Sequence, residues 1–489
     1  MRKGAACVHS LPIDRGSAVP AWKQAADGIR SLVRAGTLRA GDRLPSLRSL
    51  ALSLSVSVDT VQSAYRELEA EGWISAKRGS GFRVEEAKFA APAPAAAGDA
   101  KPAVRPARIS SRAEAAREAV RFYRGRSPEP RPFAPYGRTM GEIADPEWLR
   151  ITSSVSRSPW VASGNGNPAG DPAFRKIIAE RLREYRGIAC SPEQIVVTSG
   201  LVGNLFAAAS VLFEEGDAVG VETPAPSVFP RVLRFAGAVP AYLPTDGEGI
   251  RFGEESDPAI RGVFAVPSAQ HPLSVTMSPA RRRALLAEAA RRGAWVLEDG
   301  MEDFLWFEGQ PQPPLFSEAA PGGPVVYMES FTLQFFPGIR TGFLVAPEEL
   351  ADAFAGARLL SDRASGEEAQ RSLCRFMESP AYDAYLRKAK RRFLANREAL
   401  LESADALAAF GRLQVPPCGV HATLYLSEIP DAEASRAAGA RGVPVRALSS
   451  FDSGGAAVNG LVLGFGSGDP AAVREASRVL LSVLRELAH

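Results

Sequence analysis

Two side chains suited to binding an anion stand ten residues apart in one short stretch of this sequence. Ser330 ends an apolar run at 325–330, and Arg340 precedes a second apolar run at 343–346. The intervening segment contains proline and glycine, so the pattern predicts a strand, a crossing loop and a second strand. The arginine could hold a phosphate or carboxylate through a two-toothed contact. It could equally lock the loop by pairing with a buried carboxylate of the protein.

Basic residues are in excess in the first sixth of the chain. Residues 14–85 hold eleven Lys or Arg against eight Asp or Glu, and this excess of three equals the formal net charge of +3 of all 489 residues. The remaining residues are balanced. A local excess of positive charge points to an anionic partner for this segment.

The same segment has the pattern of a helix-turn-helix followed by a basic hairpin. Apolar residues at helical spacing predict a helix over 20–36, a short helix opened by Pro45 and Ser46, and a second helix with Ser57 as its N-cap. Residues 73–76 and 82–84 then predict two strands joined by a basic tip. In such an arrangement the second helix would enter the major groove of DNA. The alternative is a helix-turn-helix used only for protein packing.

These residues resemble the GntR-type winged helix. The matching motifs are Gly41-Asp42-Arg43-Leu44-Pro45-Ser46-x-Arg48, Val56-Ser57-x-x-Thr60-Val61, Ala64-Tyr65-x-x-Leu68-x-x-x-Gly72 and the wing Arg78-Gly79-Ser80-Gly81. The resemblance implies that phosphates or base edges of DNA are contacted by Arg43, Ser46, Arg48, Ser57, Thr60, Tyr65, Arg66, Lys77, Arg78, Gly79 and Ser80. Val58 stands where the family usually has arginine. One contact is therefore missing, or is replaced by contact with a thymine methyl group.

The composition divides the chain into two domains and a linker. Residues 87–118 are rich in alanine and proline and cannot bury a core, so we expect a linker between a domain at 14–86 and one at 119–489. Within 119–489, strand-length apolar runs alternate with helical patterns. This alternation predicts an α/β domain with a largely parallel sheet, followed by a smaller α+β region.

The large block resembles the fold-type I aminotransferase-like domain of the MocR-type regulators, which join it to the same winged helix. The segments that carry this resemblance are 166–170, 191–200, 267–278, 298–299 and the loop from Ser330 to Arg340. The resemblance implies a homodimer and a pyridoxal-phosphate site formed by Ser330, Arg340 and Asp299, with Asp299 at the pyridine nitrogen. Asp299 could instead cap a helix or face solvent.

The residues that would carry the family's chemistry are replaced. Leu333 occupies the position of the Schiff-base lysine, and an aliphatic side chain has no nitrogen with which to bond the cofactor covalently. Further replacements at positions that the family uses for the cofactor or substrate are Asn165, Pro226, Leu273, Ser274, Met301 and Val462. Their number indicates an intact scaffold whose pocket has another use.

We therefore expect a DNA-binding transcription regulator that is not an enzyme and whose large domain dimerises and senses a small ligand. The alternatives are a pyridoxal-phosphate-dependent enzyme, a regulator that holds pyridoxal phosphate noncovalently, and a large domain that only dimerises. Cys7, Cys190, Cys374 and Cys418 have no CxxC spacing, so we expect neither disulfides nor a zinc site. With no long apolar run and no signal sequence, we expect a cytoplasmic protein.

Overall fold

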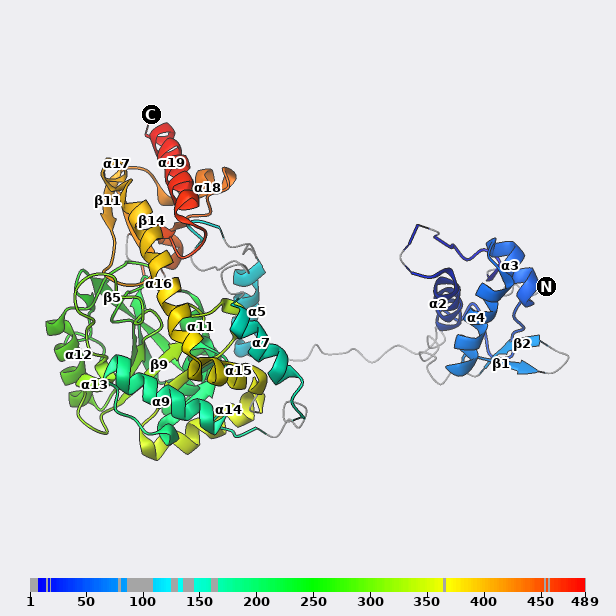
Figure 1. Cartoon of the computed structure of the whole chain (residues 1–489), viewed down its shortest axis with the longest axis horizontal. Helices are drawn as coiled ribbons and strands as arrows, with labels where there is room; N and C mark the ends of the chain where they lie inside the picture. The colour runs from blue at the N-terminus through cyan, green and yellow to red at the C-terminus, as the bar shows by residue number, and fades with distance from the viewer. Residues whose placement is uncertain are drawn as a thin grey trace, which may run out of the picture. The chain divides into compact units, whose positions relative to one another are not determined.

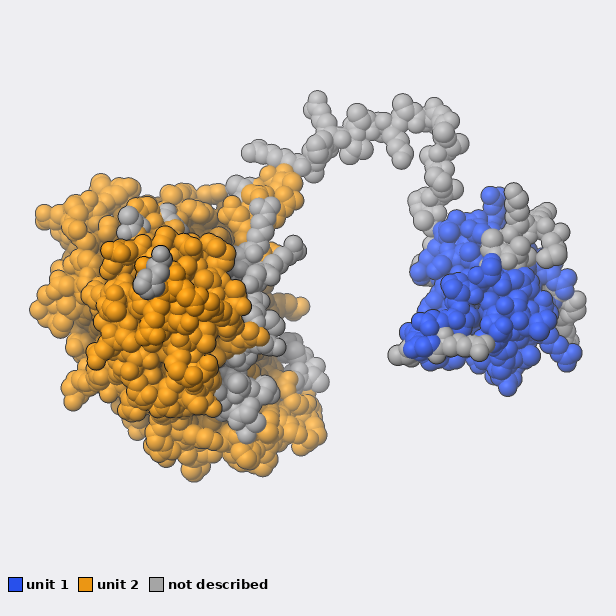
Figure 2. All heavy atoms as spheres, turned by 90° about the horizontal axis from the view of Figure 1, so that it is seen from above, with its two compact units in different colours: residues 1–107 blue, residues 108–489 orange. Residues whose placement is uncertain are grey.

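The structure, a computed structural model of the whole chain, forms two compact units, 1–107 and 108–489 (Figure 2). It describes residues 8–14, 16–17, 19–77, 81–85, 109–124, 131–134, 145–159, 166–363, 366–452, 454–455 and 458–488. Within these residues, no helix is long and apolar enough to cross a membrane.

The first unit is a winged helix-turn-helix, as the sequence predicts. Its elements are α2 (Ala21–Arg34), α3 (Leu47–Leu54), α4 (Val58–Ala70), β1 (Ile74–Lys77) and β2 (Gly81–Val84) (Figure 1). The hydroxyl of Ser46 accepts a hydrogen bond from Ser49 N at 3.2 Å, and that of Ser57 accepts one from Thr60 N at 3.1 Å. These two serines therefore begin α3 and α4, because each satisfies a backbone N–H that has no partner within its helix.

A single apolar core and one buried arginine hold this unit together. Arg30, on α2, is 9% exposed and forms a bidentate contact with Glu71, with both N–O distances at 2.8 Å. Glu71 directly follows α4, so the pair fixes α2 against α4. Val8 is fully buried in the same core. The folded unit thus begins before residue 14, where the sequence pattern placed its start.

The predicted linker also ends earlier than expected. Helix α5 (Ser111–Arg124) begins within the 87–118 segment, and Arg112 forms an ion pair with Glu215 at 3.2 Å. From residue 111 onward the sequence has no proline for the length of this helix and is rich in alanine, glutamate and arginine, which favour a helix. Structure packed against the second unit therefore starts at about this helix.

The second unit is built on an eight-stranded sheet in the order β3-β10-β9-β8-β7-β4-β5-β6. Its strands are β3 (Ile195–Thr198), β4 (Ala218–Thr223), β5 (Val239–Asp246), β6 (Gly249–Ile250), β7 (Ile260–Ala265), β8 (Trp295–Asp299), β9 (Val325–Ser330) and β10 (Gly342–Val345). Neighbouring pairs among β5, β4, β7, β8 and β9 are parallel, whereas β10 and β6 run antiparallel to their neighbours. The prediction of a largely parallel sheet is confirmed.

Helices cover both faces of this sheet, because its strands are apolar on both sides. Successive residues of β9 illustrate the division. Tyr327 packs into one core cluster with α9 (Pro172–Arg186), α15 (Glu367–Glu378) and α16 (Pro380–Leu401). Met328 packs into another cluster with helices α10 (Leu201–Leu212), α11 (Val228–Ala236) and α14 (Ala351–Asp362). Helices α7 (Pro146–Ser156), α12 (Pro279–Arg292) and α13 (Leu315–Glu318) complete the layers around the sheet.

A smaller antiparallel sheet, in the order β11-β12-β14-β13, follows α16. Its elements are β11 (Gly411–Gln414), β12 (His421–Leu426), β13 (Arg446–Ala447) and β14 (Gly460–Gly464), with α17 (Ala404–Ala408), α18 (Asp431–Ala440) and α19 (Pro470–Leu487). The apolar side chains of α19 and β12 share a core with Leu333 of the large sheet's crossing loop. The loop that carries the candidate cofactor residues is therefore anchored in the smaller subdomain.

Candidate functional sites

Three of the arginines expected to contact DNA are exposed in the winged helix. Arg43, Arg48 and Arg66 have exposed side chains, and none of them forms an ion pair with another residue that the structure describes. By contrast, Glu67 and Glu71 on or beside α4 are occupied by Arg30. These two carboxylates are thus partly neutralised, which lowers their repulsion of DNA phosphates.

The chain before α3 extends the wing by one strand. Leu44 N donates to Phe82 O at 2.9 Å, and Val84 N donates to Asp42 O at 3.0 Å, so residues 42–44 pair with β2. The same pairing places the Arg43 guanidinium beside Gly81, at the base of the wing tip. Arg78, Gly79 and Ser80 and the side chain of Lys77 lie outside the described residues.

The prediction that Tyr65 contacts DNA is wrong for this structure. Its side chain is fully buried, its ring packs edge-on against Phe82 at 4.9 Å, and its hydroxyl donates to Pro45 O at 3.0 Å. Burial raises the pKa of the Tyr65 hydroxyl. Tyr65 therefore fixes α4 against the wing and the turn before α3. Its place in the family's motif is explained by packing.

Ser46, Ser57 and Thr60 have local roles that the structure defines. Ser46 and Ser57 are the N-caps described above, and the hydroxyl of Thr60 lies 2.8 Å from that of Ser57. The hydroxyls of Ser46 and Ser57 are exposed. An N-cap at the start of a helix that meets DNA can therefore orient the helix and still present its oxygen outward.

In the second unit, Ser330 and Arg340 meet at the start of α10. Gly200 is the N-cap of this helix with φ 102°, and no side chain caps it. A Cβ atom at Gly200 would lie 3.5 Å from Ser330 Oγ and 3.8 Å from Arg340 Nη2. One at Gly342, the first residue of β10, would come within 2.7 Å of Gly200 Cα. Both glycines are thus required for the close approach that brings these groups together.

This arrangement has the chemistry of a phosphate site. A helix N-terminus with unsatisfied N–H groups, a hydroxyl and a guanidinium together favour a bound anion. Arg340 is exposed and has no ion pair with a described residue, so the alternative of a buried carboxylate partner is not what the structure contains. We refer to Gly200, Ser330 and Arg340 as the phosphate cup.

Asp299 lies at the same edge of the sheet. It is the last residue of β8, and Ser330 ends the adjacent parallel strand β9. Asp299 is 4% exposed, and its Oδ1 accepts a hydrogen bond from Met301 N at 2.9 Å. Burial raises the pKa of Asp299 well above its usual range, and neighbouring carboxyl groups raise it further. A protonated ring nitrogen would supply the positive charge that this buried carboxyl group lacks.

The part of the pocket around Leu333 is apolar. Leu333 is 5% exposed and belongs to a core cluster with Leu305 and Phe133, against which Met301 also packs. From residue 119 onward the sequence contains only three lysines, Lys176, Lys388 and Lys390. These lie on α9 and α16, on the opposite face of the sheet from the phosphate cup. The residues thus fit a phosphate and a ring nitrogen, but they do not supply an amine for a covalent bond.

The predicted substrate clamp is also replaced by packing. Val462 of β14 is fully buried in a small cluster with Leu273 and Phe451. Leu273 and Val462, two of the residues that the sequence analysis gave as replacements of the family's residues, therefore belong to one apolar core. The Val462 side chain itself offers a carboxylate neither a charge nor a hydrogen-bond donor.

Metal chemistry finds no support among the described residues. They contain no group of three or more His, Cys, Asp or Glu side chains placed to hold a metal ion. Cys190, Cys374 and Cys418 are buried free thiols, and burial raises the pKa of Cys190 to about 11.

Comparison with known proteins agrees with this division of the chain. Residues 22–84 match the bacterial regulatory proteins of the gntR family, and residues 162–453 match aminotransferase class I and II. The chain is 30% identical over 481 residues to the probable rhizopine catabolism regulatory protein MocR of Rhizobium meliloti. This alignment covers 98% of this chain and 96% of that protein. It is 29% identical over 461 residues to the pyridoxine biosynthesis transcriptional regulator PdxR of Corynebacterium glutamicum, covering 92% and 93%.

Solved structures share the fold of the second unit. An archaeal alanine:glyoxylate aminotransferase superposes with a TM-score of 0.67 at 21% identity, over 78% of this chain and 96% of that chain. The kynurenine aminotransferase of Pyrococcus horikoshii gives 0.66 at 21% identity, over 78% and 95%. The chain therefore belongs to the gntR family of bacterial regulatory proteins, in the MocR-type group that joins a winged helix to an aminotransferase-like domain.

Proposed function

We propose that this chain is a DNA-binding transcription regulator whose aminotransferase-like domain dimerises and holds a small ligand without catalysing transamination. The observation that carries the proposal is Leu333, which is packed into the core where the catalytic amine would stand. The exposed arginines of the winged helix support operator binding, and the relatives named above are described as transcriptional regulators. Pairs of winged helices in a homodimer would contact two half-sites of an operator.

DNA binding is tested by its dependence on salt. We would select duplexes from a random pool with the full chain and then measure affinity by fluorescence anisotropy across a salt series. Phosphate-led recognition predicts a steep loss of affinity with salt. Arg48→Ala should reduce the slope of log affinity against log salt by about one unit. Lys23→Ala, which removes an exposed charge from α2, is the matched control and should leave the slope unchanged. Affinity that does not depend on salt would refute the DNA-binding function.

The ligand with the strongest support is pyridoxal phosphate, held noncovalently. The phosphate cup suits its phosphate, and Asp299 suits its ring nitrogen. When bound, this cofactor supplies an electrophilic ring system, but no lysine among the described residues of the second unit is placed to hold it covalently. We expect the protein to bind it reversibly, so that dialysis removes it and borohydride does not fix it to the chain.

Two variants test the phosphate-binding part and the ring-binding part of this site separately. Arg340→Met removes the guanidinium from the phosphate cup, and Asp299→Asn removes the partner of the ring nitrogen. Each should weaken binding of pyridoxal phosphate by at least about tenfold, but only Arg340→Met should weaken binding of inorganic phosphate. A borohydride-stable adduct on any lysine would refute the noncovalent assignment and favour the enzyme alternative.

A further inference from the structure

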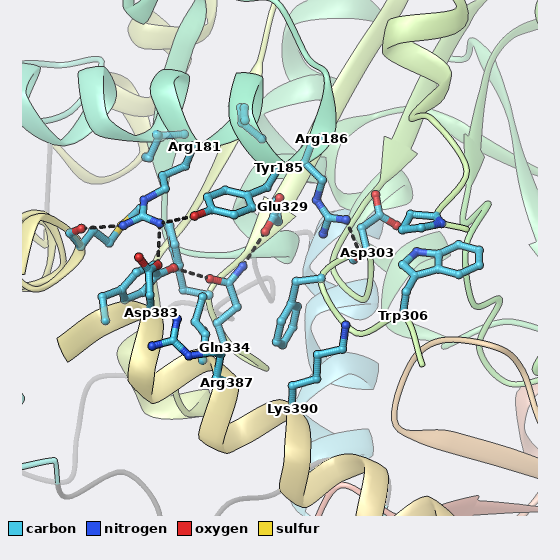
Figure 3. Close-up of a pocket in the computed structure, with 18 of the residues that line it drawn as sticks. Arg181, Tyr185, Arg186, Asp303, Trp306, Glu329, Gln334, Asp383, Arg387 and Lys390 are labelled. Atoms are coloured by element: carbon cyan, nitrogen blue, oxygen red, sulfur yellow. Dashed lines mark hydrogen bonds and ion pairs between the residues drawn. The ribbon is translucent and has the colours of Figure 1, made fainter. Parts of the chain in front are cut away.

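The second unit contains a cavity of about 390 Å³ that shares no lining residue with the phosphate cup or Asp299. It lies between α9, α16 and the sheet, with the loop at 303–311 along one side (Figure 3). This volume is in the lower part of the range of small-molecule sites.

The cavity and the phosphate cup lie on opposite faces of one strand end. Side chains alternate along a strand, so Glu329 and Ser330 point to different faces. Glu329 accepts hydrogen bonds from Tyr327 Oη at 2.8 Å and from Gln334 Nε2 at 2.6 Å, on the cavity side. Ser330 faces Gly200. The cavity is therefore a separate compartment behind the cofactor loop.

Two buried side-chain atoms at the cavity lack a hydrogen-bond partner, one on Arg186 and one on Asp303. Arg186 donates through Nη1 to the backbone oxygen of Asp303, but its Nη2 is buried and has no partner. Asp303 is 5% exposed, and its Oδ2 accepts a hydrogen bond from Tyr327 Oη at 3.5 Å, but its Oδ1 has no partner. A buried donor or acceptor left without a partner is costly, so each position favours a ligand atom that completes it.

Positive charge is in excess around the opening. Lys390 and Arg387 project from α16, and neither forms an ion pair with a described residue (Figure 3). Arg181, in contrast, is held by Asp383 at 2.6 Å and by Met377 O at 2.9 Å. The cations available to a ligand are therefore Arg186 at depth and the two α16 residues at the rim.

The remaining walls are apolar and aromatic. Phe331 and Phe343, each 2% exposed, line the cavity together with Leu182 and Trp306. Such walls stabilise the apolar body of a ligand while a few polar groups fix its orientation.

We propose that this cavity is a second binding site, for a small organic acid with an aromatic or aliphatic body and one hydrogen-bond donor. The carboxylate pairs with Arg186 Nη2 and Lys390, and the donor, a hydroxyl or amino group, reaches Asp303 Oδ1. The apolar body packs on Phe331 and Phe343. This site differs in position and chemistry from the phosphate cup and does not depend on the identity of the ligand bound there.

A matched series of probes tests this chemistry by calorimetry on the full chain. 3-Phenyllactate carries the acid and the donor, 3-phenylpropanoate lacks only the donor, and 2-phenylethanol lacks only the acid. We expect 3-phenyllactate to bind best, 3-phenylpropanoate about tenfold more weakly, and 2-phenylethanol not at all up to about 10 mM.

Variants locate the bound probe. Lys390→Met and Arg186→Met should each weaken 3-phenyllactate binding at least about tenfold. Their controls are Lys388→Met and Arg183→Met, which remove exposed charges from the same two helices outside the cavity, and these should change affinity less than about twofold. Arg340→Met should also have no effect. Because Lys390 is exposed, its variant keeps the test valid even if Arg186→Met does not fold.

Three results would overturn the proposal. One is no binding of any of the three probes. Another is equal loss of affinity in Lys390→Met and Lys388→Met, which would indicate attraction by surface charge alone. The third is loss of binding in Arg340→Met, which would place the probe in the cofactor pocket.

Discussion

At Leu333 the side chain that would reach a cofactor contributes to the core of the smaller subdomain. The change is accompanied by others in contact with it or with each other: Met301 packs on the same cluster, and Leu273 packs with Val462. An isolated loss of a catalytic lysine would leave a polar pocket with a gap. Here Leu333 and Val462 each belong to an apolar cluster, which supports the proposal that the pocket has lost its covalent and its substrate contacts together.

This coordinated change predicts the behaviour of Leu333→Lys. The new amine would be buried in the apolar core of the smaller subdomain, which lowers the pKa of a lysine and costs stability. The carboxylate clamp would still be absent, because Val462 remains in its apolar cluster. We expect no turnover of amino acids by this variant, measured by the absorbance change of added pyridoxal phosphate. Measurable turnover by the single variant would show that the pocket has been assigned wrongly.

We expect the free energy of unfolding of the chain to depend on pH through Glu329. Burial raises its pKa to about 7 from the usual 4.5, and the nearby Asp303 raises it, while Arg186, Tyr327 and Gln334 lower it. The folded chain therefore holds this proton more tightly than the unfolded chain. Its contribution to stability is present below pH 4.5 and is lost as pH rises to about 7, by up to about 3 kcal/mol.

The variant Glu329→Gln removes this titration while keeping the shape of the side chain. Relative to the natural chain, it should gain stability between pH 5 and pH 8, measured by urea unfolding at both pH values. Glu318→Gln, at an exposed position, is the control and should show the same difference at both. A difference for Glu329→Gln that does not change with pH would contradict the assignment.

At the scale of elements, the start of α4 is set by Ser57 and its orientation by Tyr65 and Arg30. Ser57 caps the helix, Tyr65 fixes its middle to Pro45 and Phe82, and Glu71 ties its end to α2. The helix thus has a defined first residue and is held at its middle and its end. The element that would enter the major groove is therefore positioned by residues that do not themselves need to contact bases.

Ser57→Ala tests the N-cap of α4. Loss of the N-cap should lower the free energy of unfolding of the first unit by about 1 kcal/mol. Ser63→Ala, on the exposed side of the same helix, should leave stability unchanged or slightly raised, because alanine favours helix. Urea unfolding followed by circular dichroism at the helical signal measures both. Equal effects of the two substitutions would contradict the capping role.

The elements were largely predictable because their signals are local. Apolar residues located the two wing strands, expected at 73–76 and 82–84 and found at Ile74–Lys77 and Gly81–Val84, and Ser57 marked the start of α4 through its capping chemistry. The start of the first unit was misplaced because Val8 is buried by tertiary contacts that no local pattern reveals. Tyr65 was misassigned because the family motif that contains it does not distinguish a residue that packs in the core from one that contacts DNA.

The cavity behind the cofactor loop was not predicted at all. Its polar residues come from α9, the loop after β8, β9 and α16, which are distant in sequence. One signal was available. Glu329 is a charged residue inside a strand whose other residues up to position 328 are apolar, and a buried carboxyl group in such a strand needs polar partners.

At the scale of the whole molecule, the two units have separate cores, and the first unit alone carries the winged helix. We therefore expect a fragment of residues 1–107 to fold without the second unit. If the second unit dimerises, the full chain presents two winged helices to one operator, and the second contact becomes intramolecular. Binding by the full chain should then be tighter than binding by the fragment by about 10²-fold or more, without any additional contact to each half-site.

The comparison requires an operator with both half-sites and a matched duplex in which one half-site is scrambled. The fragment should bind the two duplexes with affinities that differ by no more than about twofold, because it uses one half-site at a time. The full chain should lose most of its advantage on the scrambled duplex. Sedimentation of the full chain at the concentrations used supplies the oligomeric state. Equal affinity of fragment and full chain for the intact operator would show that the aminotransferase-like domain does not bring two winged helices to the same DNA.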